Sequence, residues 1–198
     1  MRASRWEIEN FVSKDFCDKL IEQAENIGFD EATIRTPDGE VVKKSYRHND
    51  RVILESRDLA ESLFEKIKDD SRIANPGWKP VGLNERFRIY RYSNPEHHFA
   101  LHFDHQVSLL YKKPVQYSWV TMLIYLNEEF EGGQTSFLDG DVEPKTGLAA
   151  FMTQKNYLHR AKAVNSGTKY VLRTDLMYIK EGEAQEVLDN SKDEQYYC

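Results

Sequence analysis

The other motifs of this sequence are best interpreted in relation to one stretch, Phe99-Ala100-Leu101-His102-Phe103-Asp104-His105. Side chains alternate along a strand, so His102 and Asp104 point to the same side, with Cβ atoms roughly 7 Å apart at ~3.3 Å of rise per residue. An imidazole nitrogen and a carboxylate oxygen at this spacing can bind one metal ion. Two ligands leave the ion under-coordinated, so the sequence predicts a third ligand elsewhere in the chain.

His159 is the candidate for the third ligand. Two histidines and one carboxylate, with open positions opposite them, are typical of non-haem Fe(II) oxygenases. A His-x-Asp step alone is a weak signal in a chain with 6 histidines. The order of the later elements strengthens it: a strand, a Gly-Gly turn, the distal histidine and a basic strand. The alternative for an isolated histidine here is a purely structural role.

Composition indicates one soluble globular domain. The chain has 198 residues and a net charge of −6, which is enough length for a single substantial core. The acidic balance argues against a nucleic-acid surface, and no apolar run approaches the ~18 residues that would cross a bilayer. The first residues contain no hydrophobic secretory signal. We therefore expect a cytoplasmic protein in which Cys17 and Cys198 are reduced thiols, and we assign neither a function.

Periodicity predicts an α+β, mainly β domain. Apolar residues recur at helical spacing over residues 14–27 and 57–69, which predicts two helices. Strands are expected over residues 5–12 and 32–54. Short strands and turns then continue from about residue 82 to 180, so the sheet region is expected to carry the site.

Two of the expected strands carry polar side chains on one face. Arg88, Tyr90 and Tyr92 share a face that suits either solvent or a polar cavity. Because this strand leads directly to the His-x-Asp step, we favour the cavity. Thr121 and Tyr125 share a face of a later strand and can donate hydroxyl groups into a site; the alternative for Tyr125 is a core tyrosine with its hydroxyl satisfied.

The last expected strand is basic. It places Lys169, Arg173 and Asp175 on one face. Two inward cations are costly to bury unless an anion matches them, and a dicarboxylate would do so. The alternative is that Asp175 neutralises Arg173 while Lys169 lies at the rim.

A polar segment, Tyr46-Arg47-His48-Asn49-Asp50-Arg51, has side chains that can hold a polar ligand. Charge density alone favours a solvated loop. We advance the alternative hypothesis that Arg47, Asn49 and Arg51 contact a substrate, together with Arg88 and Tyr90.

In combination, these motifs resemble the prolyl 4-hydroxylase-like branch of the Fe(II)/2-oxoglutarate oxygenases. The resemblance covers residues 83–180 and rests on His102-Phe103-Asp104, Tyr125-Leu126-Asn127, Gly132-Gly133-Gln134-Thr135, His159 and Gly167-Thr168-Lys169-Tyr170. It implies a double-stranded β-helix, the jelly-roll or cupin-like core, with supporting N-terminal helices and outer strands over residues 1–80. Residues 181–198 form an acidic tail, and the whole chain is then a single oxygenase domain.

The resemblance also implies roles for the site residues. Iron is held by His102, Asp104 and His159. Lys169 pairs with the far carboxylate of 2-oxoglutarate, and the Tyr125 hydroxyl assists it.

Further positions match the family pattern or depart from it. Tyr92 and Thr121 belong to the cosubstrate pocket, and Arg173 is an added cation that can share or take over the role of Lys169. Phe99 stands where many members have a second pocket tyrosine, and Asp175 where relatives often have tryptophan. These departures leave the shape of the substrate pocket open.

The implied activity is hydroxylation of an unactivated C–H bond, on a prolyl or other amino-acid side chain, with release of succinate and CO2. Fe(II), 2-oxoglutarate and O2 are the implied cofactors, with ascorbate as reductant. The implied partner is an amino-acid or peptidyl substrate, without nucleic acid or membrane. Three alternatives stay open: an oxygenase of a free amino acid or small molecule, a non-catalytic 2-oxoglutarate-binding module, and a zinc-bearing structural barrel.

Overall fold

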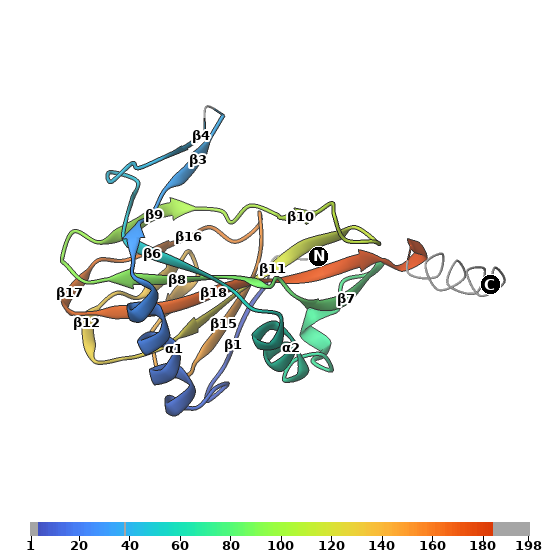
Figure 1. Ribbon diagram of the computed structural model, residues 1–198, viewed down its shortest axis with the longest axis horizontal. Helices are drawn as coiled ribbons and strands as arrows, with labels where there is room; N and C mark the ends of the chain where they lie inside the picture. Colours follow the sequence, from blue (N-terminus) through green and yellow to red (C-terminus); the bar gives the residue numbers. More distant parts are fainter. Residues whose placement is uncertain (1–3, 38, 184–198) are drawn as a thin grey trace.

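Two antiparallel β-sheets pack face to face in this protein (Figure 1). The computed structural model describes residues 4–37 and 39–183. The expectations for Cys198 and for most of the acidic tail lie outside these ranges. The described chain is mainly β with few helices, as the sequence predicts.

The larger sheet brings together strands that are far apart in the sequence. Its main path runs in the order β1 (Arg5–Ile8), β15 (Ala149–Thr153), β11 (Gln116–Tyr125), β18 (Lys169–Lys180), β8 (Arg86–Tyr92), β6 (Asp50–Glu55) and β2 (Asp30–Glu31). Two further strands extend it, β10 (Ser108–Leu109) beside β11 and β7 (Trp78–Leu83) beside β18. The last strand of the described residues, β18, therefore lies in the middle of this sheet.

The smaller sheet carries the His-x-Asp stretch. Its order is β14 (Gly140–Val142), β13 (Thr135–Phe137), β16 (His159–Ala161), β9 (His98–His102) and β5 (Arg47–His48). Two separate strand pairs complete the β structure: β12 (Phe130–Gly132) with β17 (Val164–Gly167), and β3 (Ile34–Thr36) with β4 (Gly39–Val41). The β3–β4 pair projects from the top of the molecule in Figure 1.

Alternation along β11 decides which face of the larger sheet meets which layer. Val120, Met122 and Ile124 pack into the main hydrophobic core on the helical side. Leu123 and Tyr125 point the other way and join a second core with residues of the smaller sheet. The parity of this strand was therefore predicted correctly from the sequence.

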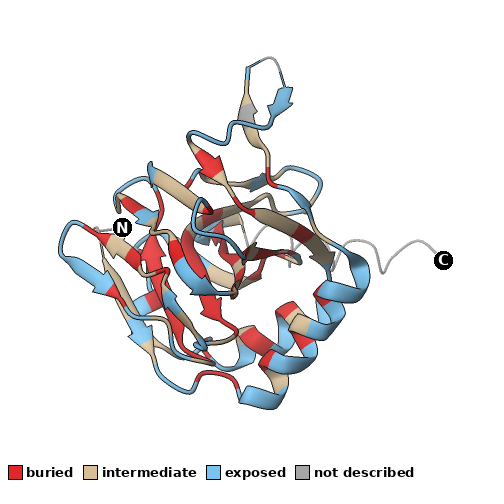
Figure 2. Ribbon diagram, turned by 90° about the vertical axis from the view of Figure 1, so that its left-hand side faces the viewer, coloured by how far each residue is buried: buried red, intermediate tan, exposed pale blue. Residues whose placement is uncertain are grey.

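The helices cover the outer face of the larger sheet. These are α1 (Lys14–Ile27), α2 (Arg57–Glu65) and the short 3-10 helix η1 (Ser71–Ile73). The side chains of Ser13 and Ser56 cap α1 and α2 by accepting the N–H groups of Phe16 and Leu59. Figure 2 shows that α1 buries only the side that faces the sheet. Among the described residues, no helix combines the length and apolar character needed to span a membrane.

Three predicted boundaries differ from the structure. The first strand ends at Ile8 rather than at residue 12, and the strand block begins at Trp78 rather than near residue 82. The second helix ends at Glu65 rather than at residue 69. Beyond it the chain tightens into turns with hydrogen bonds spanning three residues, which keep Ile67 buried without a further helical turn.

Gly147 packs closely against the backbone of Val12, which precedes the first helix. It has a φ of 79°, and the Val12 carbonyl oxygen occupies the place of a Cβ atom. Its N–H donates to the Tyr125 carbonyl over 2.8 Å. We expect Gly147→Ala to lower the free energy of unfolding by about 2–4 kcal/mol, because the strained backbone and the crowding backbone atom add together.

Urea unfolding of the variant measures this loss. Gly140→Ala is the matched control, since Gly140 also has a positive φ of 130° but no atom within 4 Å of an added Cβ. We expect the control to lose only about 1 kcal/mol. Equal losses in the two variants would show that the contact with Val12 contributes nothing.

Candidate metal centre

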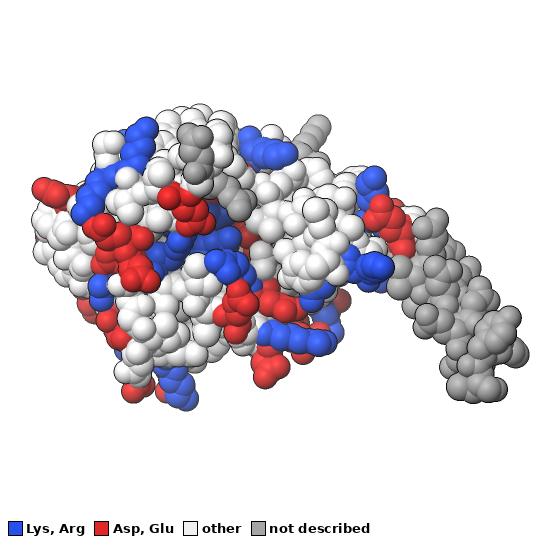
Figure 3. Space-filling view, turned by 45° about the horizontal axis from the view of Figure 1, so that its top comes forward, with Lys and Arg blue, Asp and Glu red and all other residues white. Residues whose placement is uncertain are grey.

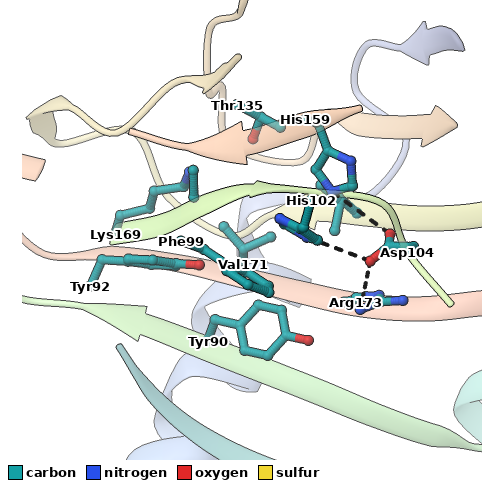
Figure 4. A pocket seen from close by; sticks show the side chains of 12 residues that line it. Tyr90, Tyr92, Phe99, His102, Asp104, Thr135, His159, Lys169, Val171 and Arg173 are labelled. Atoms are coloured by element: carbon teal, nitrogen blue, oxygen red, sulfur yellow. Dashed lines mark ion pairs between the residues drawn. The ribbon is translucent and has the colours of Figure 1, made fainter. Parts of the chain in front are cut away.

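The side chains of His102, Asp104 and His159 converge in the space between the two sheets (Figure 4). His102 ends β9 and His159 begins β16, and the two residues lie directly opposite each other in the strand register. The Nε2 atom of each histidine is 3.7 Å from an oxygen of the Asp104 carboxylate. One potential ligand atom from each residue lies within 4.8 Å of the others, so the three can hold one metal ion.

Backbone carbonyl groups orient both imidazoles for metal binding. The Nδ1 atom of His102 lies 2.7 Å from the Ala100 carbonyl oxygen, and that of His159 lies 3.1 Å from the Tyr157 carbonyl oxygen. Because a carbonyl can only accept, Nδ1 carries the proton and the Nε2 lone pair is free to bind a metal. Burial also lowers the pKa of His159, which favours the neutral ligand form.

Asp104 is buried and held as a carboxylate. The Thr121 hydroxyl donates to its Oδ2 over 2.7 Å, and Nη1 of Arg173 lies 3.0 Å from its Oδ1. Burial alone would raise the pKa of this carboxyl, but Arg173 and the two imidazoles hold the pKa well below its ordinary value. The structure thus places Thr121 and Arg173 against the carboxylate rather than at the far end of the site.

Sequence reasoning missed the polar network behind Asp104. The Gln154 side chain donates to Asp175 over 2.8 Å and to Thr121 over 3.2 Å, and it accepts from Ser118 over 2.7 Å. Asp175 also forms an ion pair with Arg173 at 3.3 Å, as expected if Asp175 neutralises Arg173. The signal for Gln154 was its position just after β15, where alternation continues the inward face of that strand.

Lys169 lies at the other end of the site and is almost fully buried, so the alternative that places it at the rim is wrong. Its Nζ donates to the Gly133 carbonyl and lies 5.4 Å and 5.2 Å from the ring centres of Tyr92 and Tyr125. Among the described residues, no carboxylate forms an ion pair with it. Burial lowers the pKa of Lys169 to about 7. This part of the chain thus holds a buried cation without a matching anion.

A cavity joins the two ends. It is lined from both sheets by Tyr90, Tyr92, Phe99, His102, Asp104, Leu123, Thr135, His159, Ala161, Lys169, Val171 and Arg173. Tyr125 is not among the lining residues, and its hydroxyl donates to that of the lining residue Thr135 over 2.7 Å. Lys169 and Arg173 stand on one face of β18 with Cα atoms roughly 13 Å apart, at ~3.3 Å of rise per residue. The metal ligands and the buried ammonium therefore lie at opposite ends of one cavity.

The polar segment before β6 is not a solvated loop at two of its three candidate positions. Arg47 is 6% exposed and Asn49 is 2% exposed. The Arg47 guanidinium lies 4.8 Å from the Tyr90 ring centre and 4.6 Å from that of Phe99. Phe99 in turn stacks on the His102 imidazole at 3.6 Å. The Phe99 ring therefore lies between the Arg47 guanidinium and the candidate metal ligand His102.

The remaining candidate substrate residues gather around Tyr90. Arg51 lies opposite Tyr90 in the register of β6 and β8, and Arg88 lies opposite Arg173 in that of β8 and β18. Burial raises the pKa of Tyr90, but Arg173, Arg47 and Arg88 outweigh it and lower the pKa overall. Positive charge is thus concentrated on this side of the cavity.

A family model described as the 2OG-Fe(II) oxygenase superfamily matches residues 87–174, which include all three candidate metal ligands. Over these residues the chain is similar to this superfamily. No curated protein matches the sequence of this chain. The family and the His-Asp-His set together imply Fe(II) and 2-oxoglutarate. The residues present fit both, since neutral imidazoles and an ionised carboxylate suit Fe(II) and a buried, unmatched ammonium suits a carboxylate.

Solved structures show the same fold as this chain. A prolyl hydroxylase from Trichoplax adhaerens, in complex with a hypoxia inducible factor peptide fragment, has a TM-score of 0.66 at 16% identity, covering 90% of this chain and 84% of that one. A prolyl-4-hydroxylase from Pseudomonas putida has a TM-score of 0.64 at 14% identity, covering 88% and 93%. The viral collagen prolyl hydroxylase of Paramecium Bursaria Chlorella virus-1 has a TM-score of 0.59 at 20% identity, covering 87% and 95%. The similarity extends over most of each chain and shows the double-stranded β-helix of 2-oxoglutarate oxygenases.

Proposed function

We propose that this oxygenase hydroxylates an unactivated C–H bond on a prolyl or other amino-acid side chain, converting 2-oxoglutarate and O2 to succinate and CO2. One observation carries the proposal: the cavity has a three-ligand metal set at one end and a buried, unmatched ammonium at the other. The prolyl hydroxylase neighbours support an amino-acid side chain as target. An oxygenase of a free amino acid or small molecule is the second candidate, because Arg47 and Arg88 offer charge that a free carboxylate can match.

Fe(II) bound by His102, Asp104 and His159 would supply the oxidative chemistry. Lys169 would bind the far carboxylate of 2-oxoglutarate, with the Tyr92 and Tyr125 rings excluding water around that ion pair. This assignment makes Lys169 the main anchor of the cosubstrate.

Three other side chains would act as positioning residues. Thr121 and Arg173 fix the two oxygens of Asp104, which sets the direction in which the carboxylate meets the metal. Phe99, stacked on His102, would shield that imidazole from solvent. Arg173 would also lie near the keto acid end of the cosubstrate, because it adjoins the metal ligands.

We further propose that the substrate enters on the side of Tyr90. Arg47, Asn49, Arg51, Arg88 and Tyr90 would contact it there. The division of the chain is part of the same proposal: residues 1–198 act as a single domain, with a core over about 83–180 and the helices and outer strands before it as support. Ascorbate would act as reductant for the iron.

Succinate formation tests the function directly. We expect the protein to release succinate with Fe(II), 2-oxoglutarate and ascorbate, and prolyl peptides or free amino acids to stimulate that release. Anaerobic Fe(II) with 2-oxoglutarate should also give a visible charge-transfer band, which a zinc site cannot show. A band without any turnover would indicate a non-catalytic binding module instead.

The pKa of Lys169 predicts how binding of 2-oxoglutarate depends on pH. Above a pKa of about 7 the free ammonium loses its proton, while binding of the far carboxylate requires it. The dissociation constant should therefore be flat below pH 7 and rise about tenfold per pH unit above it. Anaerobic calorimetry with Mn(II) in place of Fe(II) measures this slope.

Lys169→Arg is the control for the pH dependence, because a guanidinium stays charged throughout the range. The variant should bind 2-oxoglutarate with a constant that does not change between pH 7 and 9. A slope that persists in this variant would assign the titration to another group.

A further inference from the structure

We propose that the substrate carries a carboxylate next to the oxidised position, held by Arg47, Arg51 and Arg88. This inference rests on the proposed hydroxylase function and names its substrate class. The carboxylate comes either from an acidic side chain of a peptide or from the α-carboxylate of a free amino acid.

The three arginines approach Tyr90 from three different strands. Arg51 on β6 lies directly opposite it, and Arg88 shares the inward face of β8 with it. Arg47 belongs to β5 of the smaller sheet and lays its guanidinium 4.8 Å from the Tyr90 ring centre. Both sheets therefore contribute positive charge to one place beside the cavity. Figure 3 shows Lys and Arg side chains gathered in a hollow on one face of the molecule, with acidic side chains around its edge.

Among the described residues, none of these cations forms an ion pair shorter than 3.6 Å. Arg47 forms no ion pair among the described residues, and its buried Nη2 has no hydrogen-bond partner there. Nη1 of Arg88 also lacks a hydrogen bond, and its ion pair with Asp175 is long at 3.6 Å. Arg51 reaches Glu40 at 3.7 Å. Burial and repulsion from Arg47 and Arg88 lower the pKa of Arg51.

The metal and the cosubstrate would not remove this excess of positive charge. Fe(II) and the 2-oxoglutarate dianion carry equal and opposite charge. The carboxylates of Asp104 and Asp175 already face Arg173 at 3.0 and 3.3 Å. A buried hydrogen-bond donor without a partner raises the free energy of the unliganded protein. A ligand that supplies the missing acceptor therefore gains binding affinity.

The position of the cluster relates the bound anion to the reaction. Arg47 touches the Phe99 ring, which stacks on the metal ligand His102, and Tyr90 itself lines the cavity. An anion on Arg47 is thus held close to the metal centre rather than at the protein surface. Guanidinium groups match the planar geometry of a carboxylate through paired hydrogen bonds, which would fix the orientation of the neighbouring C–H bond.

The test uses pairs of compounds that differ only in carrying a carboxylate or the corresponding amide. Each is added to the 198-residue protein with Fe(II) and 2-oxoglutarate, and the stimulation of succinate formation is compared. One arm uses prolyl peptide pools with Asp or Glu next to proline against pools with Asn or Gln. The other arm uses free L-amino acids against their α-amides. We expect the carboxylate form to give at least about tenfold higher kcat/KM in one arm. That arm identifies the source of the carboxylate.

Substitutions then connect the preference to the cluster. Arg51→Gln and Arg88→Gln should each lower the carboxylate-to-amide ratio by about tenfold or more, mainly through KM for the stimulating compound. Arg86→Gln is the matched control, because Arg86 lies on the same strand but is exposed and paired with Glu55 at 2.9 Å. It should leave the ratio unchanged.

The possible failures are distinguishable. Equal stimulation by a carboxylate and its amide would overturn the inference. An unchanged carboxylate-to-amide ratio of kcat/KM in both arginine variants would also overturn it. Succinate release that no compound in either arm stimulates would also overturn it, while the oxygenase function would stand. Complete absence of succinate release and of the anaerobic band would instead contradict the proposed function itself.

Discussion

His159→Ala is expected to weaken Fe(II) binding by more than about 100-fold and to reduce succinate formation below detection. Losing a residue that merely orients a metal ligand costs about 10–100-fold in affinity, so losing a ligand should cost more. The remaining pair, His102 and Asp104, lies on one short stretch and cannot enclose the ion from the opposite strand. Anaerobic calorimetry with Fe(II) measures the affinity, and succinate release measures turnover.

The fold should survive this substitution with a moderate loss. Removing the buried imidazole leaves a cavity beside Phe137, which is expected to lower the free energy of unfolding by about 1–3 kcal/mol. Arg160→Ala is the control, because Arg160 is the next residue of the same strand and is exposed. Unchanged Fe(II) affinity in His159→Ala would remove this histidine from the metal centre.

Lys169→Met should change stability and cosubstrate binding in opposite directions. Methionine is similar in length but needs no solvation, and burial of the ammonium is costly enough to lower its pKa to about 7. We expect the free energy of unfolding of the metal-free protein to rise by about 1–3 kcal/mol. We also expect 2-oxoglutarate affinity to fall by about 100- to 1,000-fold, because its far carboxylate would be buried without a partner.

Two measurements on the same variant separate this explanation from simple misfolding. Thermal unfolding without ligand should show a higher midpoint, and calorimetry should show the lost affinity. Lys169→Arg keeps the charge and should recover part of the binding. A variant that binds 2-oxoglutarate within about threefold of the wild type would contradict the assignment of Lys169 as anchor, whatever its stability.

The parts of the site that the sequence predicts are those that depend on local alternation. His102 and Asp104 lie two residues apart, and Lys169 and Arg173 share the face of one strand, so spacing alone places them. The family resemblance then joined these two stretches to His159. The mainly β class is predictable in the same way, because short strands and turns are local features.

The features that could not be predicted depend on contacts between distant strands. Arg47 was ambiguous because its burial comes from packing on Phe99, opposite it on β9, and on Tyr90 of the other sheet. Gln154 was missed since its partners Thr121 and Asp175 lie on neighbouring strands. Register between strands is set by the whole sheet, so residue types along one strand do not reveal it.

The central place of β18 in the larger sheet has a consequence for biogenesis. Among the described strands this one is made last, yet it separates β11 from β8 and contributes Lys169 and Arg173 to the cavity walls. During synthesis the earlier strands emerge from the ribosome with a gap in the middle of their sheet. The nascent chain therefore should not close the cavity around the candidate metal ligands until translation passes this strand. Folding should be slow because its pairings join residues from 46 positions apart (Tyr125 and Val171) to 102 positions apart (Trp78 and Lys180).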